Sequence, residues 1–280
     1  MRKDSKIVLF FEAIGYVLVF LAIQLLMQYA VGKVEASLSA RSLSDGTAAA
    51  VLEGHALSTT AIIVSSVLSS LITLCLFFRL KWALWSRTYL ASRPWDQLLW
   101  VAVLTFGTII PTMWLQELLQ VEMPEAVEQM FQELMTSPYG YVVVGIFAPL
   151  AEEVVFRGAF LRLLLKVFNG RLHWIAIALS AACFGLIHGN DAQFVHAFLI
   201  GLLLGWFFWR TKSIVPGVVF HWMNNSIAYV VGNLRPDLAD KSLADICGGE
   251  SQVYLYRGFS LLILLPSLYQ IATRLPRHTD

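Results

Sequence analysis

Long apolar segments separated by short polar ones make up most of this 280-residue sequence. A helix needs about 20 residues to cross the hydrocarbon core of a bilayer; the longer segments reach that length, and the shorter ones suffice inside a packed bundle. The pattern therefore predicts an all-α, polytopic membrane protein with about eight transmembrane helices. The eight segments fall near residues 7–31, 59–80, 97–119, 139–165, 173–189, 192–209, 213–232 and 253–271.

One polar segment, residues 120–138, has a helical pattern of its own. Apolar residues such as Val127, Phe131 and Leu134 recur at helical spacing opposite glutamates such as Glu125 and Glu128. This pattern predicts a short helix on the membrane surface, either as a packing connector or as a flap over a substrate entrance.

The positions of Lys and Arg predict the orientation in the membrane, because short cytoplasmic loops are enriched in both residues. With the N-terminus inside, 15 of the 20 basic residues fall on the inner side. Both termini are then expected to be cytoplasmic. These inner residues are Arg2, Lys3, Lys6, Arg79, Lys81, Arg87, Arg93, Arg157, Arg162, Lys166, Arg171, Arg210, Lys212, Arg274 and Arg277.

Composition agrees with an integral membrane protein, since 58% of the residues are hydrophobic and only 14% are charged. The net charge of +1, without a basic stripe, makes nucleic acid an unexpected partner. We find no internal repeat, which favours one membrane domain over residues 1–280. Cys75, Cys183 and Cys247 form no disulfide framework, and Gly201 with Gly205 forms a GxxxG pattern that favours close helix packing.

Three charges interrupt the segment APLAEEVVFRG, residues 148–158, which otherwise reads as membrane-spanning. Charged groups at bilayer depth are costly and indicate a functional site. Glu153 and Arg157 have the i,i+4 spacing of an ion pair, whereas Glu152 points elsewhere. Glu152 is therefore the candidate general base, unless the cluster is a purely structural ion network. Pro149 should bend this helix and free the carbonyl of Gly145.

Two later segments carry polar side chains that could complete a hydrolytic site. FGLIHG places His188 four residues after Phe184, and HWMNN places Asn225 four residues after His221. A base, an imidazole that orients water and a His/Asn pair that donates to an oxyanion would suffice to hydrolyse an amide. His196 is assigned to core or cavity polarity rather than to catalysis.

These motifs together resemble the CPBP (Abi) family of intramembrane proteases, which includes the type II CAAX prenyl endopeptidases. The family signatures Glu-Glu-x-x-x-Arg, Phe-x-x-x-His and His-x-x-x-Asn occur in order within residues 140–232. The resemblance implies a catalytic core in this range, built around a polar cavity inside the membrane. Carried over residue by residue, it assigns water activation to Glu152 and His188, the oxyanion hole to His221 and Asn225, and support to Glu153 and Arg157.

The resemblance leaves the cofactor open, because many members are described as metalloproteases. Zinc could be held by Glu152, His188 and His221. No His-Glu-x-x-His motif is present, and a metal-free site is favoured.

Function also has alternatives outside the protease class. A non-catalytic immunity or scaffold protein could keep the same residues, as could a transporter with a proton relay, although the duplicated halves typical of many transporters are missing. The expected partners are the bilayer and a membrane-associated or prenylated-type peptide, in the plasma membrane of a bacterium. Neither the cleavage site nor the oligomeric state can be read from the sequence.

Overall fold

The computed structural model describes the chain except for residues 1–4, 43–56, 85, 170–171, 239–240 and 276–280, and the side chains of 40–42. Arg2, Lys3, Arg171 and Arg277 of the predicted inner basic group lie outside the described residues. Within the described part, the secondary structure is helical and contains no strand, which confirms the all-α prediction.

Helices occupy each of the eight predicted spans, and the predicted surface helix is present as α6. The bounds in chain order are α1 Lys6–Ser42, α3 Thr59–Arg79, α4 Arg87–Ala91, α5 Trp95–Leu118, α6 Glu125–Thr136, the π-helical η1 Val142–Phe147, α7 Ala148–Glu153, the π-helical η2 Val154–Leu161, α8 Arg162–Val167, α9 His173–Leu186, α10 Asp191–Thr211, α11 Val215–Leu234, the 3₁₀ turn η4 Pro236–Leu238, α12 Leu243–Cys247 and α13 Glu250–Arg274.

Five of these helices are long and apolar enough to cross a membrane: α1, α3, α5, α10 and α13. The other three predicted spans are helical but differ from a simple crossing. α9 has 14 residues and ends at Leu186, before the predicted limit of residue 189. Residues 142–167 alternate between π-helical and α-helical turns, and α11 carries several polar side chains along its 20 residues. The count of eight spans therefore remains a prediction.

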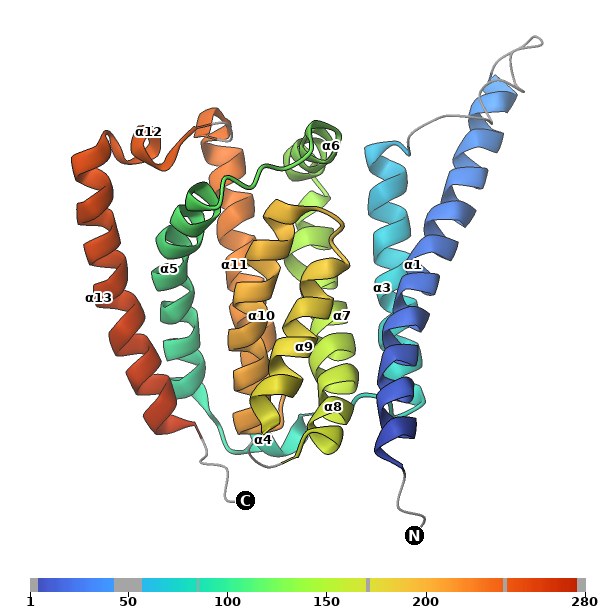
Figure 1. The fold of residues 1–280 in the computed structure, drawn as a ribbon. Coiled ribbons are helices and arrows are strands. Elements are labelled where there is room, and N and C mark those ends of the chain that lie inside the picture. Colours follow the sequence, from blue (N-terminus) through green and yellow to red (C-terminus); the bar gives the residue numbers. More distant parts are fainter. Residues whose placement is uncertain (1–4, 43–56, 85, 170–171, 239–240, 276–280) are drawn as a thin grey trace.

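The helices stand side by side with α7 to α11 in the middle of the bundle (Figure 1). α1 and α3 pack together on one side, and α5 and α13 pack together on the other. The start of α1 and the end of α13 lie at the same end of the bundle as α4 and α8, whereas α6 and α12 lie at the opposite end. Large apolar side chains such as Phe11, Leu25 and Leu262 remain exposed on the outer helices, as expected of surfaces that face lipid.

Small residues allow the central helices to approach closely. A Cβ on Gly205 of α10 would lie 2.8 Å from the side chain of Ile177, and one on Gly201 would lie 3.0 Å from that of Ala181, both on α9. The predicted role of the GxxxG pattern in helix packing is thus confirmed. The close approach of α9 and α10 brings the loop between them, which contains His188, to the mouth of the site described next.

Candidate active site

The segment that carries the two glutamates changes its hydrogen-bond register around Pro149. In the π-helical turn η1, the N–H of Ala148 donates to the carbonyl of Val143, five residues earlier. The same spacing would pair the carbonyl of Val144 with residue 149, which is a proline without an N–H. The amide Nδ2 of Asn225 donates to this Val144 carbonyl at 2.9 Å. The α-helical spacing predicted that the carbonyl of Gly145 would lose its backbone donor. In the π turn the affected carbonyl is that of Val144, one residue earlier.

Glu153 and Arg157 form the predicted ion pair, with 2.8 Å between Oε1 and Nη1. Both side chains are buried, at 0% and 1% exposure, so each charge depends on the other for compensation. The guanidinium carbon lies 4.4 Å from the centre of the Phe184 ring, which adds a cation–π contact. Gly217 on α11 leaves the space for the carboxylate, because a Cβ at this position would overlap Oε2 of Glu153.

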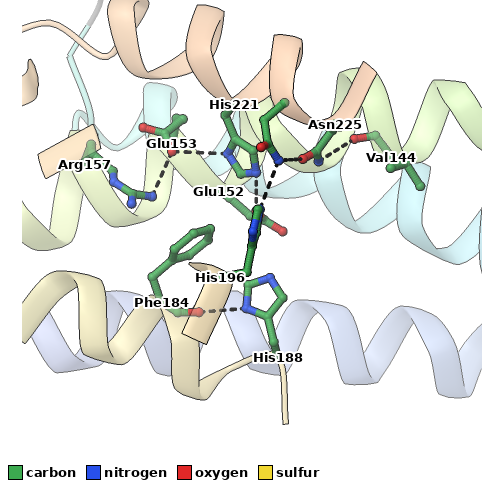
Figure 2. A network of polar contacts seen from close by, with 10 residues as sticks. Val144, Glu152, Glu153, Arg157, Phe184, His188, His196, His221 and Asn225 are labelled. Atoms are coloured by element: carbon green, nitrogen blue, oxygen red, sulfur yellow. Dashed lines mark hydrogen bonds and ion pairs between the residues drawn. The ribbon is translucent and has the colours of Figure 1, made fainter. Parts of the chain in front are cut away.

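His221 lies between the two glutamates and connects them (Figure 2). Its Nδ1 is 3.4 Å from Oε1 of Glu153, and its Nε2 is 3.7 Å from Oε2 of Glu152. His221 is 4% exposed, and its ring makes a T-shaped contact with the ring of Phe184, with 5.8 Å between the ring centroids. Glu152 has its charge partner on α11, whereas the sequence analysis found none for it on its own helix.

Glu152, unlike Glu153, opens onto a cavity of about 360 Å³. Its side chain is 15% exposed, and the cavity also contains His188, His221 and Asn225. The four residues predicted to be catalytic therefore line one space, although they come from α7, the α9–α10 loop and α11.

His188 does not continue α9, as the i,i+4 prediction assumed, but lies in the turn after the helix. Gly189 follows with φ +73°, a left-handed conformation that suits glycine and ends the helix. The Nδ1 of His188 is 2.8 Å from the carbonyl of Phe184, so Nδ1 carries the proton and Nε2 presents a lone pair. The chain turn thus determines which ring nitrogen can accept a proton.

A chain of side-chain hydrogen bonds, made by two amides and an imidazole, extends the site beyond the predicted residues (Figure 2). The Nδ2 of Asn224 is 3.2 Å from Oδ1 of Asn225 and 3.2 Å from Nε2 of His196. Since Nδ2 donates both bonds, His196 accepts through Nε2 and carries its proton on Nδ1. From the sequence, His196 was expected to be a polar residue of the core or of a cavity rather than a catalytic one. It is one of the residues that line the cavity. One sequence signal could have linked His196 to the site. Its helix, α10, lies in the chain between α9, which precedes His188, and α11, which carries His221 and Asn225.

Helix α6 lies at the end of the bundle opposite α4 and α8 (Figure 1) and contributes to the lining of the cavity. Phe131 and Leu134, on its apolar face, line the cavity. Asn233 of α11 donates to the carbonyl of Met135 at 2.7 Å, and Tyr229 donates to the carbonyl of Ser137 at 3.1 Å. The amphipathic helix predicted from the sequence therefore packs on the bundle and also lines the polar cavity.

A zinc site would need ligands that converge on one point, about 2.0–2.2 Å from the ion for His and Glu. Among the residues that the structure describes, no group of three or more His, Cys, Asp or Glu side chains is placed to hold a metal. Glu152, His188 and His221, the alternative zinc ligands, share the cavity but do not converge as a ligand set. The charges of the site are instead arranged around His221, between two carboxylates.

Comparison with known proteins bears on the same part of the chain. Residues 135–227 match the family model described as "Type II CAAX prenyl endopeptidase Rce1-like". The match confirms the resemblance inferred from the three motifs, and it contains all six predicted site residues. No curated protein and no solved structure matched the chain.

Proposed function

We propose that this protein is an intramembrane endopeptidase of the CAAX type, which hydrolyses a peptide bond of a membrane-associated or prenylated-type substrate. The family match supports the class of reaction. The observation that carries the proposal is that Glu152, His188, His221 and Asn225 line one cavity within an apolar bundle.

In this proposal, water is activated between Glu152 and His188. The lone pair on Nε2 of His188 accepts one hydrogen bond from the water, and the Glu152 carboxylate removes the other proton as the oxygen attacks the carbonyl carbon. Glu152 then delivers this proton to the leaving amine as the C–N bond breaks. Glu153 cannot replace it, because its carboxylate is fully buried against Arg157.

The negative charge that develops on the carbonyl oxygen needs donors on the other wall of the cavity. Asn225 uses one amide hydrogen on the Val144 carbonyl and keeps the second for the oxyanion. His221 lies on this wall with Nδ1 3.4 Å from Glu153 and Nε2 3.7 Å from Glu152, and in the proposal its Nε2–H is the second donor to the oxyanion.

The basic residues support an orientation with both termini in the cytoplasm. Arg79, Lys81, Arg87, Lys166 and Arg274 all lie at the end of the bundle where α1 begins and α13 ends. In that orientation α6 is on the outer face, and a movement of α6 would admit substrate to the cavity.

The direct test is peptide cleavage by the purified full-length protein in lipid vesicles. Candidate membrane peptides, including a farnesylated CAAX peptide, are incubated with wild type, Glu152→Gln and the control Glu250→Gln, and products are identified by mass spectrometry. Glu152→Gln keeps the shape but removes the base, so cleavage should fall by roughly 10²–10⁴-fold.

The control Glu250 is exposed at the start of α13 and should retain wild-type cleavage. Equal cleavage by wild type and Glu152→Gln would refute the mechanism. Wild-type protein that cleaves none of the peptides, while Glu152→Gln retains the cellular phenotype, would favour a binding or scaffold role. Addition of a chelator to the same assay tests the zinc alternative, since a metal-dependent site would lose activity.

A further inference from the structure

A second, larger hollow lies on the opposite side of α7 from the candidate active site. Its volume is about 890 Å³, within the range of about 300 to 1,000 Å³ that is typical of small-molecule sites. α3, α7 and α11 contribute a mostly apolar lining that also includes Arg79 of α3, and we call it the apolar groove. Representative lining residues are Leu71, Leu74, Phe78, Leu150, Val215 and Val218.

The apolar groove continues into a smaller cavity of about 290 Å³, since Leu84, Ser86 and Ile214 line both. This second cavity also contains two lysines and an arginine: Lys166, Lys212 and Arg162. No acidic side chain is among its lining residues in the part of the chain that the structure describes, and we call it the basic pocket. The basic pocket and the apolar groove therefore lie next to each other and differ in chemistry.

The three cations are placed to receive an anion. Arg162 uses Nη2 on the carbonyl of Trp82, at 2.6 Å, but its buried Nε has no hydrogen-bond acceptor within the described structure. Lys166 and Lys212 are exposed, and their ammonium groups are mobile donors. A ligand with a phosphate would complete the bonds that the protein leaves open.

The location identifies the ligand as a lipid. The basic pocket lies where α8 and α10 end, at the end of the bundle that holds α4 and the start of α1 (Figure 1). The apolar groove extends from there along the second half of α3 and the first turns of α11. Basic pockets between transmembrane helices on the cytoplasmic side are known to bind anionic lipid headgroups.

We propose that an anionic phospholipid binds here, with its phosphate in the basic pocket and an acyl chain in the apolar groove. The site shares no lining residue with the 360 Å³ cavity, so its occupancy does not depend on the proposed peptidase activity. Among the described residues, the apolar groove touches the helices of Glu152 and His221 through Leu150 on α7 and through Val215, Val218 and Val219 on α11.

Native mass spectrometry of the detergent-solubilised full chain tests this site. The protein is titrated with phosphatidylglycerol and with phosphatidylcholine of the same acyl chains, and soluble glycerol phosphate is the headgroup probe. Phosphatidylglycerol should bind at least about tenfold more tightly than phosphatidylcholine. The double variant Lys166→Gln/Lys212→Gln should weaken phosphatidylglycerol binding about tenfold to thirtyfold, as expected for the loss of two cations near a membrane surface.

A matched control removes the same charge from the same end of the bundle but outside both cavities. The control Lys81→Gln/Arg87→Gln matches the test pair in backbone conformation. In each pair one lysine is left-handed, with φ 59° at Lys81 and 54° at Lys212, and the other residue is helical. The control should retain phosphatidylglycerol binding within twofold. Cys75→Trp, which narrows the apolar groove, should weaken the binding of both lipids equally.

Three results would overturn the proposal. The first is equal affinity for the two lipids, and the second is an equal loss in the test and control pairs. The third is tight binding of glycerol phosphate alone, which would indicate a soluble phosphate ligand instead. Size-exclusion chromatography and thermal unfolding identify any variant that fails to fold, and Lys166→Arg/Lys212→Arg, which keeps the charge, should retain binding.

Discussion

The active-site cavity and the apolar groove lie on two sides of the same short helix, α7, and differ in almost every property. Glu152 faces a cavity with three imidazoles and four side-chain amides, whereas Leu150, two residues earlier, faces a groove lined mainly by apolar side chains. The larger hollow is the apolar one, and the smaller carries the candidate chemistry. In this protein the neighbouring polar groups, not the volume, distinguish a reaction site from a lipid-binding site.

The two sides also differ in how much they depend on buried charge. The polar side needs Glu153 and Arg157, both almost fully buried, to hold His221 in place. The apolar side has no buried ion pair among its lining residues in the described part of the chain, and most of these residues are apolar. Substitutions on the polar side should therefore cost stability, activity or both, and those in the groove should cost little of either.

The largest effect on stability should come from Arg157→Met. It leaves the Glu153 carboxylate buried without a counter-ion, and the expected destabilisation is about 3–5 kcal/mol. Thermal unfolding in detergent measures it. The double variant Glu153→Leu/Arg157→Met removes both charges and should recover most of that loss, yet remain inactive because His221 loses its partner. A single variant as stable as wild type would show that the ion pair does not support the site.

Asn225→Ala should give the next largest effect, this time on catalysis. It removes a proposed oxyanion donor, and kcat should fall by about 10²–10³-fold, equivalent to about 2.7–4 kcal/mol. Asn224→Ala is the matched control, because Asn224 bonds to Asn225 and His196 but has no proposed contact with the substrate. Equal losses in the two variants would assign Asn225 to the network rather than to the oxyanion. Peptide cleavage under saturating substrate measures both.

Gly217→Ala should have an intermediate effect on stability. The new methyl group overlaps Oε2 of Glu153, and overpacking of this kind costs about 1–3 kcal/mol. Thermal unfolding checks it against Gly258→Ala on α13, where an added Cβ meets no atom within 4 Å. If both variants unfold at the wild-type temperature, the carboxylate can move away and the proposed constraint on Glu153 is wrong.

Leu150→Ala should have the smallest effect on catalysis. The side chain faces the apolar groove, so peptide cleavage should change by less than about twofold, even though Glu152 is only two residues away. The cleavage assay with purified protein checks this expectation. A loss comparable to that of Asn225→Ala would mean that the two sides of α7 are coupled.

Much of the fold could be predicted from the sequence because lipid imposes a simple rule. Every backbone polar group must be satisfied internally, so long apolar segments become helices, and each of the eight predicted segments is helical. The i,i+4 spacing likewise predicted the contact between Glu153 and Arg157, which depends only on local helix geometry. The amphipathic pattern of residues 120–138 predicted α6 for the same reason.

The rest of the site depends on contacts between distant segments, which no local pattern encodes. The π turn before Pro149 leaves a carbonyl that Asn225 reaches from a helix 81 positions away. His188 leaves its helix because Gly189 turns the chain, and His196 joins the site through Asn224. His221 meets both glutamates only because Gly217 lets α11 approach α7.

The apolar helices and the charged residues within apolar segments could be identified from the amino-acid sequence, because hydrophobicity and helical spacing are local properties. Which side chains share a cavity, which carbonyl faces the His188 ring, and how the apolar groove lies against the basic pocket became clear from the folded chain. These features arise from the packing of helices in three dimensions, where a single glycine or a shift of one hydrogen bond changes which groups meet.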